Sequence, residues 1–240
     1  MPYAYSLAAQ PANGPLTVAA EAFANTKVTT DGIGVASGLV RLATFFQECI
    51  PFLSQNGMAN ITNTGKLLGV GRGIVSVPNA LADLNRLVSA LKARKILDVF
   101  SAYTSCVSST FAAAAIFVTN AAQQARLSTA SSVYRTFSHC GALKTTLAKR
   151  KEAKGLTQTE SDACGREYYA EQGKILEYKI AKYVFGLFAA LGTIAALASA
   201  TLPPVATGAI LVASLFSSIF SLTAELKTEG AMYQRTEVRA

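Results

Sequence analysis

The dominant feature of the hydropathy pattern is an apolar stretch near the C-terminus, Tyr183 to Ala224, without a single charged residue. It is 42 residues long, and Pro203 and Pro204 stand almost at its centre. Each half has the length that an α-helix needs to cross a hydrocarbon core of about 30 Å at about 1.5 Å per residue. Because a proline pair ends one helix and allows another to start, we expect a helical hairpin with a very short turn. Both chain ends would then lie on one side of a membrane.

The alternative is a buried helix pair in a soluble helical protein. A soluble helix normally shows a charged or strongly polar residue every turn or two on its wet face. This stretch offers only hydroxyls and glycines for about eleven turns. The pattern therefore favours an all-α membrane protein with a C-terminal transmembrane hairpin.

Small residues recur at four-residue spacing inside the first half of the stretch. The pairs are Gly186 with Ala190, Gly192 with Ala196, and Ala196 with Ala200. Such spacing permits close helix approach, which predicts hairpin packing or a homo-oligomer. The only ionisable group in the stretch is Tyr183, at its edge, which argues against transport by a single chain.

The chain before the hairpin has helical periodicity in several places. Residues 1–30 are small and polar and are expected to be poorly ordered. Val35 to Glu48 predicts an amphipathic helix that faces a core or lies on a membrane surface, and residues 56–73 look rich in turns. Asn79 is a candidate helix cap before a coiled-coil-like seam. That seam comprises Leu81, Leu84, Val88 and Leu91.

Val99 to Ala125 is also uncharged but is rich in Ser and Thr. A crossing here would put the basic cluster at Lys92–Lys95 and the basic segment after Arg126 on opposite sides. We therefore expect a helix that is buried in a bundle or lies against the bilayer, with three membrane spans as the alternative.

Residues 126–182 form a basic helical region. Gly155 is expected to break it, and Thr157 with Glu160 predicts a capping box that starts another helix. The chain thus divides into 1–30, a helical region 31–125, the basic region 126–182, the hairpin 183–224 and a polar tail 225–240.

The distribution of charge indicates which part of the chain faces the cytoplasmic side of a membrane. The net charge is +8, and residues 126–182 hold eleven Lys or Arg against six Asp or Glu. A basic flank marks the cytoplasmic face of a membrane protein and attracts anionic lipids. The candidate lipid or partner contacts are Lys92, Arg94, Lys95, Lys149, Arg150 and Lys151. Nucleic acid is not expected, because basic and aromatic residues do not interleave.

No residue pattern indicates an enzyme. The four cysteines do not have the spacing of a zinc site, and the single histidine, His139, adjoins Cys140 in the sequence, unlike most catalytic pairs. The chain contains no Walker loop, HExxH motif or serine elbow. We expect no catalytic residue, cofactor or metal.

The two lobes of Tyr183 to Ala224, with the small polar N-terminus, resemble the inclusion membrane proteins of chlamydiae. The resemblance implies a type III secreted protein in the membrane of the vacuole that houses the bacteria. Its helical region would recruit host proteins or lipids from the host cytosol. A weaker similarity, carried by the amphipathic segment 39–53 and the later apolar segments, is to the peroxisome-elongating peroxins, which implies a membrane-shaping role.

Overall fold

A computed structural model describes residues 15–49, 54–94, 96–198 and 202–237, and every element in these ranges is an α-helix. The all-α prediction is confirmed. The helices are α1 (Pro15–Cys49), α2 (Gln55–Ala93), α3 (Ile96–Phe117), α4 (Ala121–Thr159), α5 (Ala163–Ala198) and α6 (Pro204–Glu237).

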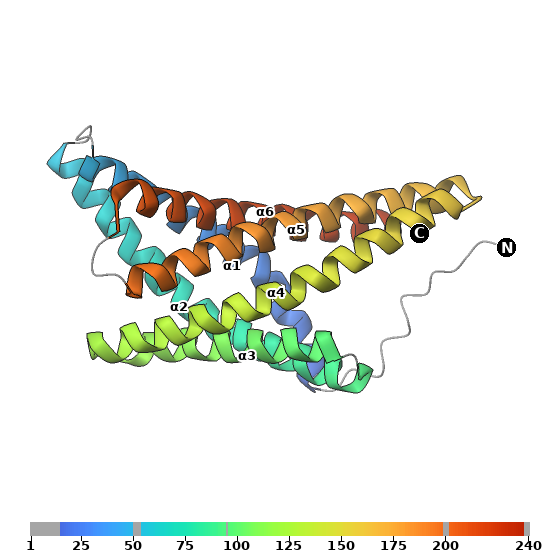
Figure 1. Ribbon diagram of the computed structural model, residues 1–240, viewed down its shortest axis with the longest axis horizontal. Coiled ribbons are helices and arrows are strands. Elements are labelled where there is room, and N and C mark those ends of the chain that lie inside the picture. The colour runs from blue at the N-terminus through green and yellow to red at the C-terminus, as the bar shows by residue number, and fades with distance from the viewer. Residues whose placement is uncertain (1–14, 50–53, 95, 199–201, 238–240) are drawn as a thin grey trace.

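The six helices run up and down along the long axis of the molecule (Figure 1). The connections α1–α2, α3–α4 and α5–α6 lie at one end, on the left of Figure 1. The α2–α3 and α4–α5 connections lie toward the other end, to which α6 also returns. We call the end with the α5–α6 connection the turn end, and the end with the α4–α5 connection the arm end.

Each helix packs against its neighbours in the chain, and α1 also packs against α6, so the described helices close into a ring. Glycines let α1 and α6 meet closely. A Cβ atom at Gly38 would lie 3.0 Å from Leu215 Cδ1, and one at Gly34 would lie 3.2 Å from Ser218 Oγ. The Ser221 hydroxyl donates a hydrogen bond to Asp31 Oδ2 at 2.6 Å, which adds a polar link between the two helices.

The C-terminal hairpin consists of α5 and α6, as the sequence predicts. Pro204 is the first residue of α6, and the Pro203 carbonyl accepts a hydrogen bond from Thr207 N at 3.1 Å. Aromatic rings hold the two helices together, because Phe185 stacks on Phe216 and Phe220 at centroid distances of 5.4 and 5.6 Å.

The hairpin of α3 and α4 is held by serines instead. Ser108 Oγ donates to Ser131 O at 2.9 Å, and Ser131 Oγ donates to Ser108 O at 3.0 Å. Ser101 and Ser138 form the same reciprocal pair at 3.3 Å. All four serines are buried. Two of the hydroxyls that make Val99 to Ala125 less apolar, those of Ser101 and Ser108, therefore face α4 and join the two helices.

Several predicted boundaries in the N-terminal half are wrong. Helix α1 begins at Pro15, so residues 15–30 are helical, whereas residues 1–14 lie outside the described ranges. Residues 56–73 belong to α2, whose N-cap is Ser54 and not Asn79. Asn79 lies inside α2, where its Nδ2 donates to Thr30 Oγ1 at 3.3 Å. Packing of α2 along α1 and α3 outweighs the weak helix propensity of its Gly and Asn residues.

The expected break in the basic region is also displaced. Helix α4 continues through Gly155 to Thr159, and Glu160 is its C-cap, so Thr157 and Glu160 end a helix and do not start one. Ile175 of α5, beyond this point, is buried and only 2% exposed. Helices α5 and α6 run without interruption through the boundaries expected at residues 183 and 225.

Candidate functional site

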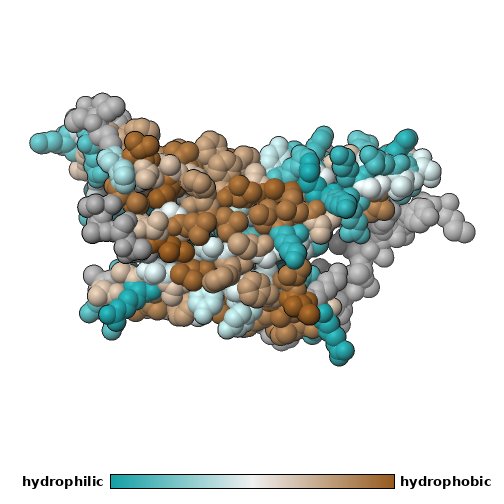
Figure 2. Space-filling view, in the orientation of Figure 1, coloured by the Kyte–Doolittle hydropathy of each residue, from teal (hydrophilic) through white to brown (hydrophobic). Residues whose placement is uncertain are grey.

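The outer surface carries many large apolar side chains. Figure 2 shows them as a broad apolar zone over the bundle, with polar residues gathered at the arm end and at parts of the turn end. Members on the hairpin are Val184, Phe188, Leu191, Val205, Val212 and Phe216. Phe188 is 62% exposed and Val205 is 84% exposed. An apolar surface of this extent on a water-soluble monomer would be unusual, whereas a lipid environment accounts for it.

Three described helical segments are long and apolar enough to cross a membrane. They are Ile96–Phe117, Gly165–Ala196 and Pro204–Thr228, and the last is the most apolar. The second and third form the predicted hairpin, and the first coincides with α3.

The path of α4 bears on the charge argument against a crossing by α3. From the turn end α4 runs back along α3 and α5, so its basic C-terminal part lies toward the arm end (Figure 1). Lys92 and Arg94, which precede α3, lie at the α2–α3 connection toward the same end. The basic runs at Lys92 and at Lys149–Lys151 therefore lie toward the same end, which membrane insertion favours, whereas Arg126 near the start of α4 lies toward the turn end.

The tip of the α4–α5 hairpin is polar and projects from the apolar zone (Figure 2). We call residues 144–182 the arm. Lys149, Arg150 and Lys151 are exposed on it. Arg150 Nη2 lies 2.6 Å from Glu177 Oε1, which ties α4 to α5, whereas no partner is recorded for Lys149 and Lys151 among the described residues. Of the second basic cluster, Lys92 and Arg94 are exposed, and Lys95 lies outside the described residues.

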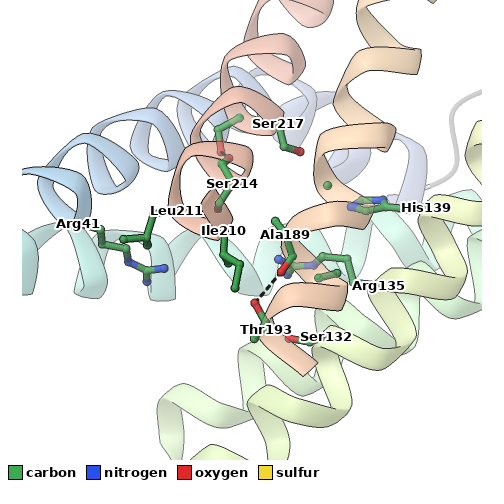
Figure 3. A pocket seen from close by; sticks show the side chains of 13 residues that line it. Arg41, Ser132, Arg135, His139, Ala189, Thr193, Ile210, Leu211, Ser214 and Ser217 are labelled. Carbon is green, nitrogen blue, oxygen red and sulfur yellow. Dashed lines mark hydrogen bonds between the residues drawn. The ribbon is translucent and has the colours of Figure 1, made fainter. Parts of the chain in front are cut away.

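A cavity of about 290 Å³ lies where α1, α4, α5 and α6 meet. It is lined by Arg41, by one face of α4 from Ser132 to His139, by α5 between Gly186 and Thr193, and by α6 between Ile210 and Ser218. Figure 3 shows Arg41 reaching into this space from α1, and Arg135 reaching into it from α4 on the opposite side. Sequence reasoning missed this site, because the charges come from outside the apolar stretch.

Two opposing effects act on the pKa of Arg135. Burial in the bundle lowers its pKa, and the Asp83 carboxylate of α2 raises it. Arg135 is nevertheless exposed, because its side chain points into an open cavity. Asp83 itself accepts a hydrogen bond from Ser109 of α3. Because guanidinium keeps its proton in proteins, Arg135 is a cation at neutral pH.

His139 lies on the same lining and is held against α5. Its ring is 5.6 Å from the Tyr183 ring, and a Cβ atom on Gly186 would lie 2.6 Å from its Nε2. Burial, then the positive charges of Arg135 and Lys182, lower the pKa of His139 to about 3. The imidazole is therefore neutral at pH 7. Its Nδ1 atom is buried and has no hydrogen-bond partner in the described part of the chain.

The predicted packing residues of α5 fall into different environments. Gly186 faces His139 and Ser217, Gly192 faces Ile210, and Ala190 is buried. A Cβ atom on Gly192 would lie 2.4 Å from Ile210 Cγ1, so the backbones of α5 and α6 approach closely there. Ala196 is exposed, and Ala200 lies outside the described residues.

No group of three or more His, Cys, Asp or Glu side chains that could hold a metal occurs among the described residues. Comparisons with protein-family models, curated proteins and solved structures give no match.

Proposed function

We propose that this chain is an integral membrane protein that holds its basic arm at the surface of the bilayer. The α5–α6 hairpin crosses the membrane, with the turn at Pro203 on the far side. The arm, the N-terminus and the C-terminus lie on the near side. The arm binds anionic lipid headgroups there, or a protein partner with an acidic surface.

The observation that carries this proposal is the exposed apolar zone along a charge-free hairpin. Val184, Phe188 and Leu191 are 48%, 62% and 55% exposed, although each is large and apolar. Transfer of such side chains into lipid is favourable by roughly 0.3 to 0.6 kcal/mol each for Leu, Phe and Val on the insertion scale. Summed over both helices, insertion exceeds the small cost of their hydroxyls.

Extraction at alkaline pH tests the anchoring. Membranes from cells that express the full chain are washed with sodium carbonate and sedimented. The protein is expected in the pellet and is released only by detergent. Recovery in the carbonate supernatant would show a peripheral or soluble protein and would refute the anchor.

A charge-removal variant tests the arm. Each Lys or Arg near an anionic surface contributes about 1 kcal/mol to its attraction, or about fivefold in affinity. The full chain in neutral-lipid nanodiscs is mixed with vesicles that contain phosphatidylserine. Replacement of Lys149 and Lys151 by Gln should weaken co-flotation by more than tenfold (about 1.4 kcal/mol). The matched control is Lys66→Gln, an exposed lysine of α2, and an equal loss in this control would refute a specific role for the arm.

We propose further, from the resemblance to chlamydial inclusion membrane proteins, that the membrane is that of a host vacuole. The chain would then be exported by a type III system and recruit host factors through its arm. The small polar N-terminus and the two-lobed hairpin support this proposal. A reporter fused to residues 1–30 should be exported by a type III system and retained when the system is inactivated. Retention in both strains would refute the secreted role.

A further inference from the structure

The second functional feature is the cavity between α1, α4, α5 and α6. We propose that it binds a small free oxyanion, such as inorganic phosphate, between the guanidinium groups of Arg41 and Arg135. This site is distinct from the exposed basic arm and uses different residues.

The first support is the absence of partners for the two arginines. Neither guanidinium forms a hydrogen bond or an ion pair in the part of the chain that the structure describes. Both point toward the cavity (Figure 3). Guanidinium offers five N–H donors in a planar fork, and this geometry matches the oxygens of phosphate or a carboxylate.

The second support is the balance of charge around the cavity. Its described lining contains two arginines and no carboxylate. Asp83 acts on Arg135 from α2, and Lys182 and Arg135 both repel a proton from His139. On the lining itself the two arginine cations face no negative side chain. Arg41 and Arg135 are both exposed to the solvent that fills the open cavity, and an anion between them would relieve the repulsion of two like charges.

The third support comes from the hydrogen-bond donors on the cavity lining. Nδ1 of His139 has no partner among the described residues, but protein atoms cover it, so it does not offer a hydrogen bond to the cavity. Most of the hydroxyls on the lining already donate to their own or a neighbouring helix backbone. Thr193, Ser217 and Ser218 do so at 2.8 to 3.1 Å. Among the described residues, the lining donors without a partner are therefore the two guanidinium groups and the hydroxyl of Ser214.

The position of the cavity along α5 and α6 relates the anion site to the proposed membrane span. Gly186–Thr193 and Ile210–Ser218 belong to the charge-free parts of α5 and α6, away from the turn at Pro203. If the hairpin spans the bilayer, the arginines lie at membrane depth, where charged groups mark binding sites or ion pathways. This depth rests on the proposed function, whereas the binding of an anion does not.

The test is a titration of the purified full chain in detergent with inorganic phosphate at constant ionic strength, measured by calorimetry. We expect saturable binding. Arg41→Gln and Arg135→Gln should each weaken it by about tenfold or more, because each removes charged hydrogen bonds. The matched control is Arg126→Gln, an exposed arginine of α4 outside the cavity, which should bind phosphate as the original chain does.

Arg41→Lys and Arg135→Lys retain the charge and replace the fork by a single ammonium group. They should bind with intermediate affinity, and they decide the question if the Gln variants do not fold. No saturable binding by the original chain, or an equal loss in Arg126→Gln, would overturn the proposal. So would native mass spectrometry that finds a phospholipid retained by the original chain and absent from both Arg→Lys variants, because the source of the phosphate would then be a lipid headgroup. Since these measurements use detergent, their failure leaves the carbonate result unaffected.

Discussion

The two hairpins α3–α4 and α5–α6 are held together by different interactions. Buried serines join α3 to α4 by hydrogen bonds that each helix donates to the backbone of the other. Stacked phenylalanines and a glycine contact join α5 to α6. A polar helix such as α4 can be joined to its neighbour by side-chain hydrogen bonds. Helices without charge, such as these parts of α5 and α6, are joined by close packing at small residues. Where α4 packs on α5, its polar side chains line the cavity.

The largest expected effect comes from filling the contact between α5 and α6. Gly192→Val would place side-chain atoms inside Ile210, because the Cβ atom alone would lie 2.4 Å from Ile210 Cγ1. Overpacking should destabilise the protein by about 3 kcal/mol, measured by thermal unfolding in detergent with circular dichroism. The double variant with Ile210→Ala should recover part of the loss.

Gly173→Val is the matched control, because nothing lies within 4 Å of a Cβ atom at Gly173 on the arm. Equal destabilisation by both variants would show that α5 and α6 do not approach as closely as described.

The next effect arises where the two hairpins meet. Because the pKa of His139 is lowered to about 3, the unfolded chain binds its proton more readily than the folded chain. The neutral imidazole of His139 therefore contributes to the free energy of unfolding. This contribution is fully present above pH 6.5, the usual pKa of histidine, and is lost as the pH falls toward 3. The loss should be on the order of 2 kcal/mol between pH 6.5 and 5.

The groups that face His139 are Arg135 of its own helix and Lys182 and Tyr183 of α5. His139→Asn should lessen the decline in melting temperature over this pH range, while the slopes from carboxylates remain. Identical slopes in the two proteins would contradict a neutral, enclosed imidazole.

A smaller effect is expected for the serine hairpin. Ser108→Ala combined with Ser131→Ala removes the reciprocal bonds between α3 and α4, and hydrogen bonds between membrane helices average about 0.6 kcal/mol each. The loss should be about 1 kcal/mol in thermal unfolding. Thr110→Ala with Thr129→Ala is the control, because these hydroxyls bond to their own helix backbone. A larger loss in the control would rule out serine bonding as the link.

The smallest effect on stability is expected on the arm. Arg150→Ala breaks the ion pair with Glu177, whose side chains are 44% and 57% exposed. Exposed pairs contribute less than about 1 kcal/mol, so the melting temperature should hardly change. A large loss would mean that the arm is part of the packed bundle and does not project from it.

The sequence predicts the hairpin well because its signals are local, namely the absence of charge and the proline pair. It predicts α2 badly, since its glycines and asparagines look like turns until α1 and α3 pack along it. The cavity could not be predicted. Arg41 and Arg135 are far apart in the chain, and only the closure of α1 on α6 brings them to the same space.

Protease protection in sealed vesicles tests the central claim most directly. The full chain carries one tag at each end and a cleavage site at Ser161, on the connection between α4 and α5. With this face outside, protease should remove both tags and cut at Ser161, while a fragment that contains residues 183–224 stays protected. Protection of only one of the two tags, or digestion of the hairpin in intact vesicles, would contradict a hairpin that crosses the bilayer with its arm on the side of both termini.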